Sequence, residues 1–178
     1  MTRYAVLLRG INVGRGKRVG MADLRGLLEE AGFSDVATLL QSGNVALTSE
    51  DSATAIARTV ERAITRRLEL DVAVVVRTRE EIREVIERDP LGDVAGDGSR
   101  YVVAFMASAP GKELPELLDS VDAGEDRYVV SGRELFVWCP QGQMKSPLMT
   151  ALGKADGGPV TTVRNWNTVQ KLGALLER

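Results

Sequence analysis

Histidine is absent from this chain of 178 residues, and cysteine occurs only once, as Cys139. The absence of histidine excludes a Ser-His-Asp triad, a Cys-His pair and any zinc site with a histidine ligand. A single cysteine forms neither an internal disulfide nor a Cys-only zinc site, and it is typical of a reducing compartment. Acid–base chemistry would therefore depend on Asp, Glu, Lys, Tyr or Cys.

Aromatic residues are scarce and long apolar runs are missing. Phe, Trp and Tyr make up 4% of the chain, and no segment reaches the roughly 20 apolar residues that span a bilayer. The start of the chain, Met1-Thr2-Arg3-Tyr4, leads straight into an apolar strand and predicts no signal peptide. No Asp-x-Asp-x-Asp-Gly calcium loop occurs. We expect a cytoplasmic protein that does not enter a membrane, with no metal site and no cofactor identifiable from the sequence.

The residues that are present predict a packed globular protein with an uneven charge. Hydrophobic residues make up 44% and charged residues 27% of the chain. Residues 1–27 hold six basic groups against one acid, and residues 141–178 hold five against two. Residues 79–140 hold seven basic and fourteen acidic groups. Basic ends around an acidic middle argue against a nucleic-acid binder that uses its whole surface, but they permit a local anion site.

The first half of the chain predicts the element order β-α-β-β-α-β. The apolar patterns indicate strands at 4–8, 36–40, 45–47 and 72–76, and helices at 21–31 and 53–68. This order is typical of the ferredoxin-like fold.

The second half predicts the same order again. Thr78-Arg79-Glu80-Glu81 is a capping box that begins a connecting helix. Strands are expected at 101–106, 127–131, 134–138 and 160–163, and helices at 114–121, 146–154 and 168–177. We predict an α+β protein of two tandem ferredoxin-like subdomains with antiparallel sheets, residues 1–78 and 79–178. The second subdomain includes the connecting helix and a C-terminal helix.

The loop from Gly10 to Arg18 is rich in glycine and basic residues and lies between a strand and a helix. Its glycines allow backbone N–H groups to converge, and Arg15, Lys17 and Arg18 add charge, which suits a phosphate or carboxylate. The loop matches neither a Walker A loop, because Gly16-Lys17 comes one residue too late, nor the Rossmann spacing. The alternative is a flexible connection with solubilising charges.

Three other segments contain candidate residues. Gln41-Ser42-Gly43-Asn44 predicts a hairpin turn, since all these residue types except Gln favour turns. Arg164-Asn165-Trp166-Asn167-Thr168 opens the last helix, with Asn167 predicted as the N-cap and Gln170 three residues on. Arg164, Asn165 and Trp166 suit a phosphate with a planar ring, and the alternative is that Trp166 packs between the lobes. Ser146 predicts another N-cap, and Cys139 is expected to be buried and inert.

These motifs resemble, along the whole chain, the domain of unknown function 1697 family. The resemblance rests on four segments in order: 8–14, 21–25, 41–45 and 162–172. It implies a bacterial, cytoplasmic α+β protein with a pair of ferredoxin-like subdomains. It implies no activity, cofactor or catalytic residue. Arg15 stands where a second glycine after Gly14 is typical of the family, and this departure bears on how closely the loop can wrap around a ligand.

Three functions are compatible with these observations. The favoured one is binding or turnover of a small anionic, nucleotide- or phosphate-like ligand in a basic cleft between the two subdomains. The candidate ligand-binding residues are Arg9, Asn12, Arg15, Lys17, Arg18, Ser42, Asn44, Arg164, Asn165, Trp166 and Asn167. One alternative is a nucleic-acid module, against which stand the few aromatics and a pI near 5.4. The other is a non-catalytic protein-interaction or oligomerisation unit. The sequence assigns no catalytic residue and no oligomeric state.

Overall fold

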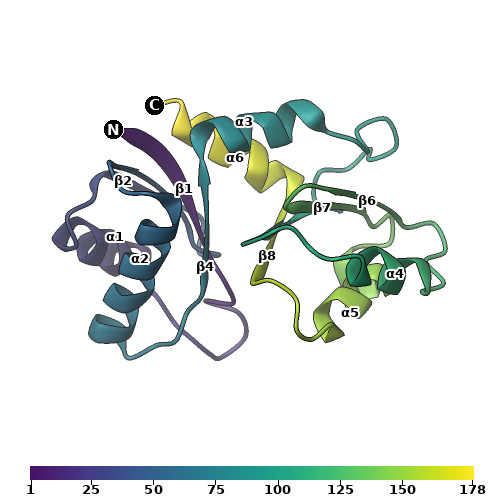
Figure 1. Ribbon diagram of the computed structural model, residues 1–178, viewed down its shortest axis with the longest axis horizontal. Coiled ribbons are helices and arrows are strands. Elements are labelled where there is room, and N and C mark those ends of the chain that lie inside the picture. The colour runs from purple at the N-terminus through teal and green to yellow at the C-terminus, as the bar shows by residue number, and fades with distance from the viewer. The chain divides into compact units, whose positions relative to one another are not determined.

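The computed structural model describes residues 1–178 as an α+β protein with six α-helices and two four-stranded antiparallel sheets (Figure 1). The packing divides the chain into unit 1, residues 1–87 and 170–178, and unit 2, residues 88–169. None of the helices combines the length and the apolar character that crossing a membrane requires.

Unit 1 contains the first sheet and two helices that follow the predicted order. The elements are β1 (Thr2–Leu8), α1 (Met21–Glu30), β2 (Ser34–Leu39), β3 (Asn44–Ser49), α2 (Ala53–Leu68) and β4 (Val74–Thr78). The strands lie in the order β2-β3-β1-β4. In this register Val6 of β1 lies opposite Val45 of β3 and Val76 of β4. The last strand begins and ends two residues later than the sequence predicts.

The core of unit 1 lies between this sheet and helices α1 and α2, which cover one of its faces (Figure 1). Alternation along β1 directs Tyr4, Val6 and Leu8 to the helices. Apolar residues at helical spacing, such as Leu24 in α1 and Ile56 in α2, complete the cluster and are fully buried. Both helices therefore form because each buries one apolar stripe on the sheet.

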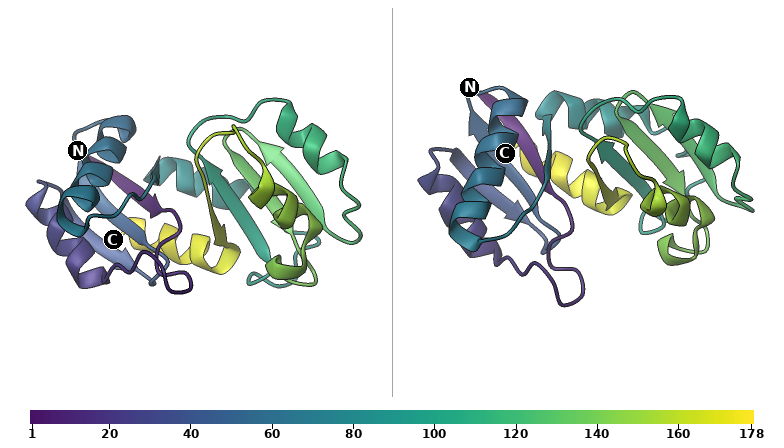
Figure 2. Two further views of the ribbon diagram at one scale, coloured as in Figure 1. Left: turned by 90° about the horizontal axis from the view of Figure 1, so that it is seen from below. Right: turned by 60° about the horizontal axis from the view of Figure 1, so that its bottom comes forward.

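Unit 2 repeats the order of elements and the order of strands. Its elements are β5 (Tyr101–Met106), α4 (Glu113–Asp119), β6 (Arg127–Ser131), β7 (Glu134–Trp138), the 3-10 turn η1 (Gln143–Lys145), α5 (Pro147–Lys154) and β8 (Thr161–Asn165). The sheet order is β6-β7-β5-β8. Helices α4 and α5 lie on one face of this sheet (Figure 2), where Leu118 and Leu148 pack on Val102, Ala104 and Val137. The repeat of element order predicted from the sequence is confirmed.

The two remaining helices, α3 (Arg79–Arg88) and α6 (Trp166–Leu176), test the predicted caps. The capping box of α3 is confirmed: the Glu81 N–H donates to Thr78 Oγ1 at 3.1 Å, and the Thr78 N–H donates to Glu81 Oε2 at 2.8 Å. The predicted N-cap of α6, Asn167, is wrong. Asn165 is the cap, because its Oδ1 accepts the Thr168 N–H at 2.9 Å. Strand β8 continues to Asn165, so the helix begins at Trp166 and already contains Asn167.

Candidate functional site

The loop between β1 and α1 has an unusual backbone conformation. Gly10, Asn12, Gly14 and Lys17 all have positive φ, at 66°, 54°, 58° and 42°. Glycine adopts this region without a Cβ clash and asparagine tolerates it better than most residues, whereas lysine is strained there. Four such residues within eight positions give a compact, folded-back loop rather than an extended one.

Asn12, a predicted ligand contact, closes this loop. Its backbone N–H donates to the Lys17 carbonyl at 3.0 Å. Its side-chain Oδ1 accepts the Val19 N–H at 2.9 Å, and Nδ2 donates to the carbonyls of Val19 at 2.9 Å and Gln41 at 2.7 Å. Both donors of the amide are therefore occupied within the protein. Asn12 holds the loop shut and ties it to the turn between β2 and β3.

The predicted hairpin turn at 41–44 is confirmed, and it lies against the base of the loop. Asn44 is fully buried, and its Nδ2 donates to the Leu39 carbonyl at 2.8 Å and to Ser42 Oγ at 3.0 Å. The Leu8 N–H donates to the Gly43 carbonyl at 2.9 Å. A Cβ on Gly43 would lie only 2.7 Å from Ile11 Cδ1. Two motifs some thirty residues apart in the sequence are thus adjacent in unit 1.

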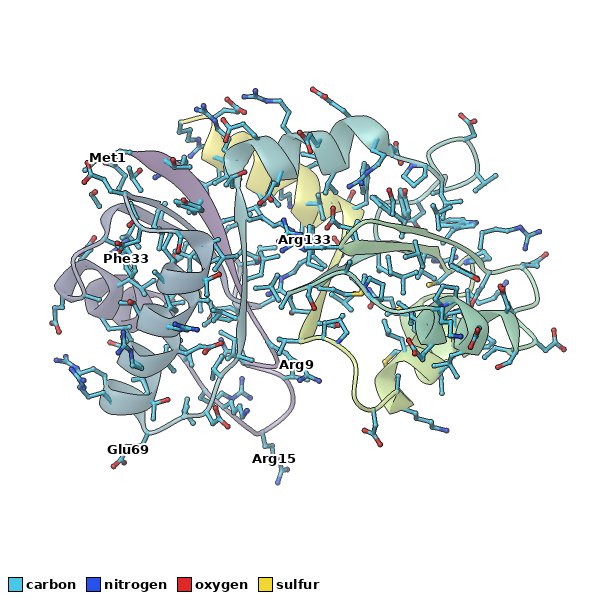
Figure 3. The ribbon with its side chains drawn as sticks, in the orientation of Figure 1. Met1, Arg9, Arg15, Phe33, Glu69 and Arg133 are labelled. Atoms are coloured by element: carbon cyan, nitrogen blue, oxygen red, sulfur yellow. The ribbon has the colours of Figure 1, made fainter.

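The four basic side chains of the loop fall into two pairs. Lys17 Nζ donates to the Asp71 carbonyl at 2.5 Å, and Arg18 Nη2 donates to the Gly14 carbonyl at 2.6 Å, so both brace the loop. Arg9 and Arg15 are exposed, and neither guanidinium makes a hydrogen bond or an ion pair. Figure 3 shows Arg15 at the tip of the loop, with its side chain pointing away from the sheet of unit 1. Arg9 and Arg15 are therefore available to an external anion.

The loop backbone offers further donors. The N–H groups of Val13, Gly14, Arg15, Lys17 and Arg18 donate to no acceptor in the protein. Residues 9–18 contain four basic side chains and no acidic one. Exposed N–H groups in a turn with alternating backbone handedness favour a bound anion. The loop thus combines backbone donors with positive charge and contains no carboxylate.

The predicted site residues 164–167, at the junction of β8 and α6, have structural contacts within unit 2. Arg164 is 7% exposed, and its Nη1 donates to Thr162 Oγ1 and to the Val163 carbonyl, each at 2.8 Å. Burial lowers the pKa of this guanidinium to about 10. The Trp166 ring stacks on Tyr101 with 4.8 Å between ring centroids. Their ligand-binding role, together with that of Asn165 and Asn167, stays a prediction.

Cys139 is fully buried, as predicted. Burial raises the pKa of its thiol to about 11. Ser146 is the predicted N-cap of α5 and is confirmed, since its Oγ accepts the Met149 N–H at 3.0 Å. The same hydroxyl donates to Asp126 Oδ2 at 2.6 Å. A buried thiol with a raised pKa is protonated at neutral pH.

Two buried acidic groups are not indicated by any pattern in the sequence. Asp126 is 6% exposed and Glu134 is 7% exposed. Glu134 Oε1 accepts from Arg88 Nη2 at 2.7 Å, and the Arg88 guanidinium also lies over the Phe136 ring. Their partners lie 20 and 46 positions away, so no local spacing indicates either pair. No group of three Asp, Glu or Cys side chains is arranged to hold a metal ion.

Comparison with known proteins places this architecture among related chains. The family model described as Protein of unknown function (DUF1697) matches residues 1–136. A solved structure of a conserved bacterial protein from Streptococcus pneumoniae is 25% identical and superposes with a TM-score of 0.82. The match covers 98% of each chain. A comparison with curated proteins gives no match.

Proposed function

The chain belongs to the DUF1697 family of proteins of unknown function, and we propose that it binds a small phosphate-like anion at the β1–α1 loop of unit 1. One observation carries the proposal. At least five backbone N–H groups of this loop lack an acceptor, in a segment that contains four basic side chains and no acid. Phosphate oxygens accept several hydrogen bonds at once and match such a set of donors.

Two features suit the loop to binding without a large ordering cost. Asn12 fixes the loop through its side chain and through its backbone N–H, and the Lys17 and Arg18 side chains brace the chain further. A site that is already ordered loses less conformational entropy when a ligand binds. Arg9 and Arg15 then supply planar guanidinium groups that pair with phosphate through two parallel hydrogen bonds.

The finer fold assignment belongs to the same proposal. We infer that each unit is ferredoxin-like, and the support is the β-α-β-β-α-β order combined with the strand orders β2-β3-β1-β4 and β6-β7-β5-β8. This fold accommodates many unrelated functions, so it favours no particular ligand. The anion proposal therefore rests on the loop alone.

Isothermal titration calorimetry with pyrophosphate and with ADP tests the proposal. We expect binding by the wild type and at least about tenfold weaker binding by the Arg9→Ala/Arg15→Ala double variant, because each charged hydrogen-bonding pair contributes on the order of 1 kcal/mol. Arg58→Ala is the matched control, because Arg58 is an exposed, unpaired arginine on α2 of the same unit. Absence of binding by the wild type, or equal binding by the double variant, would overturn the proposal.

A further variant separates charge from loop order. Asn12→Ala keeps every basic side chain but removes the contacts to Val19 and Gln41. We expect weaker pyrophosphate binding with an unfavourable change in binding entropy, since the loop must then become ordered on binding. Unchanged affinity would show that the loop's conformation has no part in binding.

A further inference from the structure

A pocket of about 590 Å³ lies on unit 2 beside helices α4 and α5, and no function described above uses it. Pockets that hold small organic ligands have volumes of roughly 300–1,000 Å³. Six of its lining residues are Leu117, Met144, Lys145, Pro147, Ala151 and Lys154, and Thr150 and Ala155 complete the lining. The pocket belongs to one unit, and its size suits a small molecule.

The floor of the pocket is apolar. Leu117 comes from α4, while Pro147 and Ala151 lie one helical turn apart on α5. Ala151 is small, and a larger side chain at this position would fill the space. Met144 is 96% exposed although it lines the pocket. Its unbranched thioether side chain is adaptable and can pack over an apolar ligand.

The charge around this floor has one sign. Lys145 and Lys154 line the pocket, and no acidic side chain does. The side chains of both lysines are exposed and make no hydrogen bond or ion pair. Lys145 precedes α5, and Lys154 is the last of its eight residues, so the two lie near opposite ends of a helix about 12 Å long. A positive group thus stands at each end of an apolar surface.

The two ends differ in the field of the helix. The N-terminus of α5, next to Lys145, has the positive end of the helix dipole, and the C-terminus at Lys154 has the negative end. Ser146 occupies the first of these ends as a buried cap and leaves the lysine side chain outside. A negative group is therefore more stable beside Lys145 than beside Lys154.

We propose that this pocket binds a free amphipathic carboxylic acid with an unbranched alkyl chain of medium length. The alkyl chain lies on Leu117, Pro147 and Ala151, and the carboxylate pairs with Lys145. Met144 packs over the chain from outside. Lys154 adds a weaker attraction at the far end. The site lies in a different unit from the phosphate-like site and takes a different class of ligand, so neither proposal depends on the other.

Titration of the ¹⁵N-labelled full chain with butanoate, hexanoate, octanoate and decanoate, followed by NMR, tests the proposal. We expect affinity to rise about twofold to fourfold for each added methylene, because each leaves water for the apolar floor. Chemical-shift changes should centre on Thr150, Ala151 and Lys154. Lys145→Ala should weaken decanoate binding about fivefold and Lys154→Ala about twofold. Lys112→Ala, an exposed lysine on the same unit that does not line the pocket, should have no effect.

Two further arms keep the proposal falsifiable. Ala151→Phe should abolish decanoate binding by filling the pocket, and its NMR spectrum reports whether the variant is folded. Decyltrimethylammonium has the same chain with the opposite charge, so the wild type should bind it at least tenfold more weakly than decanoate. Affinity independent of chain length, shifts confined to other elements, or equal binding of the cation would each overturn the proposal.

Discussion

Units 1 and 2 share one arrangement of strands and helices but differ in the segments that connect them. After the first strand, unit 1 has a basic loop over residues 9–20, whereas unit 2 has the short connection 107–112 with Lys112 as its one charged residue. The third strand of unit 1, β3, is followed by the helix α2, which has 16 residues. The third strand of unit 2, β7, is followed by η1 and then by α5, which has eight residues. Each unit has its own sheet of the same topology, which supplies its core. The surface that distinguishes one unit from the other comes from the connecting segments.

The hairpin turns β2–β3 and β6–β7 also differ between the units, in the surroundings of one glycine in each turn. Gly43 in unit 1 and Gly132 in unit 2 both have positive φ, at 85° and 60°. A Cβ on Gly132 would meet nothing within 4 Å, but one on Gly43 would press on Ile11 and Leu8 at the base of the loop. The unit 1 turn is therefore a packing element beneath the basic loop, and the unit 2 turn is only a connection.

The largest expected effect follows from this contrast. Gly43→Ala should lower the free energy of unfolding by about 3 kcal/mol, which combines a strained backbone with overpacking against the Ile11 side chain. Gly132→Ala is the matched control and should cost about 1 kcal/mol, from the backbone alone. Urea unfolding followed by circular dichroism measures both. Equal losses for the two variants would show that the contact with the loop contributes nothing.

The N-caps of α2 and α5 provide the next comparison. Ser52 caps α2 at an exposed position, where its Oγ accepts the Ala55 N–H at 3.2 Å. Ser146 caps α5 while buried, and it also donates to the carboxylate of Asp126. Ser146→Ala should cost about 2–3 kcal/mol, since it removes the cap and leaves a buried carboxylate without this donor.

Ser52→Ala serves as the reference for the Ser146 variant and should cost about 1 kcal/mol. Chemical unfolding of both variants under the same conditions gives the difference directly. If Ser146→Ala cost no more than Ser52→Ala, the hydrogen bond to Asp126 would have no net effect on stability.

The caps also show what the sequence can predict. The Thr78–Glu81 box and the Ser146 cap are local patterns, and both are confirmed. The sequence predicts the N-cap of α6 two residues too late, because asparagine at 165 and asparagine at 167 are equally good capping residues. Only the pairing of β8 with β5, which extends to Asn165 opposite Val102, decides between them. Local chemistry thus predicts the elements well, and tertiary pairing fixes their ends.

The candidate site was predictable in its composition but not in its internal contacts. Glycine and basic residues between a strand and a helix indicate an anion loop from the sequence alone. The sequence does not reveal that Asn12 is occupied by the carbonyls of Val19 and Gln41. Nor does it separate Lys17, which braces the loop, from Arg15, which does not. Those roles depend on which carbonyls the fold brings near, and no spacing in the sequence records that.

The only thiol of the protein, Cys139, lies in unit 2 and predicts how the free energy of unfolding depends on pH. Burial raises the pKa of Cys139 to about 11, whereas an unfolded cysteine has a pKa of about 8.5. The thiol therefore contributes its full stabilisation below about pH 8.5 and loses it as the pH rises through the folded pKa. Between pH 8 and 10 the wild type should lose about 2 kcal/mol more stability than Cys139→Ala.

Unfolding of both proteins by urea across this pH range measures the difference in slope. The comparison of slopes removes the constant cost of the smaller side chain in the variant. Parallel curves for the two proteins would show that the thiol titrates normally in the folded state.

The smallest expected effects concern two ion pairs, one in each unit. Arg67 and Glu30 in unit 1 lie 2.9 Å apart with side chains 58% and 61% exposed. Arg88 and Glu134 in unit 2 lie 2.7 Å apart with side chains 35% and 9% exposed. Arg88→Met should cost about 1–2 kcal/mol, because it removes a charged donor from a buried carboxylate and a cation from the Phe136 ring.

Arg67→Met should change stability by less than about 0.5 kcal/mol, because water and salt screen an exposed pair. The two variants are compared by urea unfolding at low and at high salt. The effect of Arg67→Met should vanish in 1 M NaCl, where the Debye length is about 3 Å, and most of the effect of Arg88→Met should persist. A loss for Arg88→Met that disappears in salt would mean that the Glu134 carboxylate is effectively solvated. Burial would then no longer distinguish this ion pair from its exposed counterpart in unit 1.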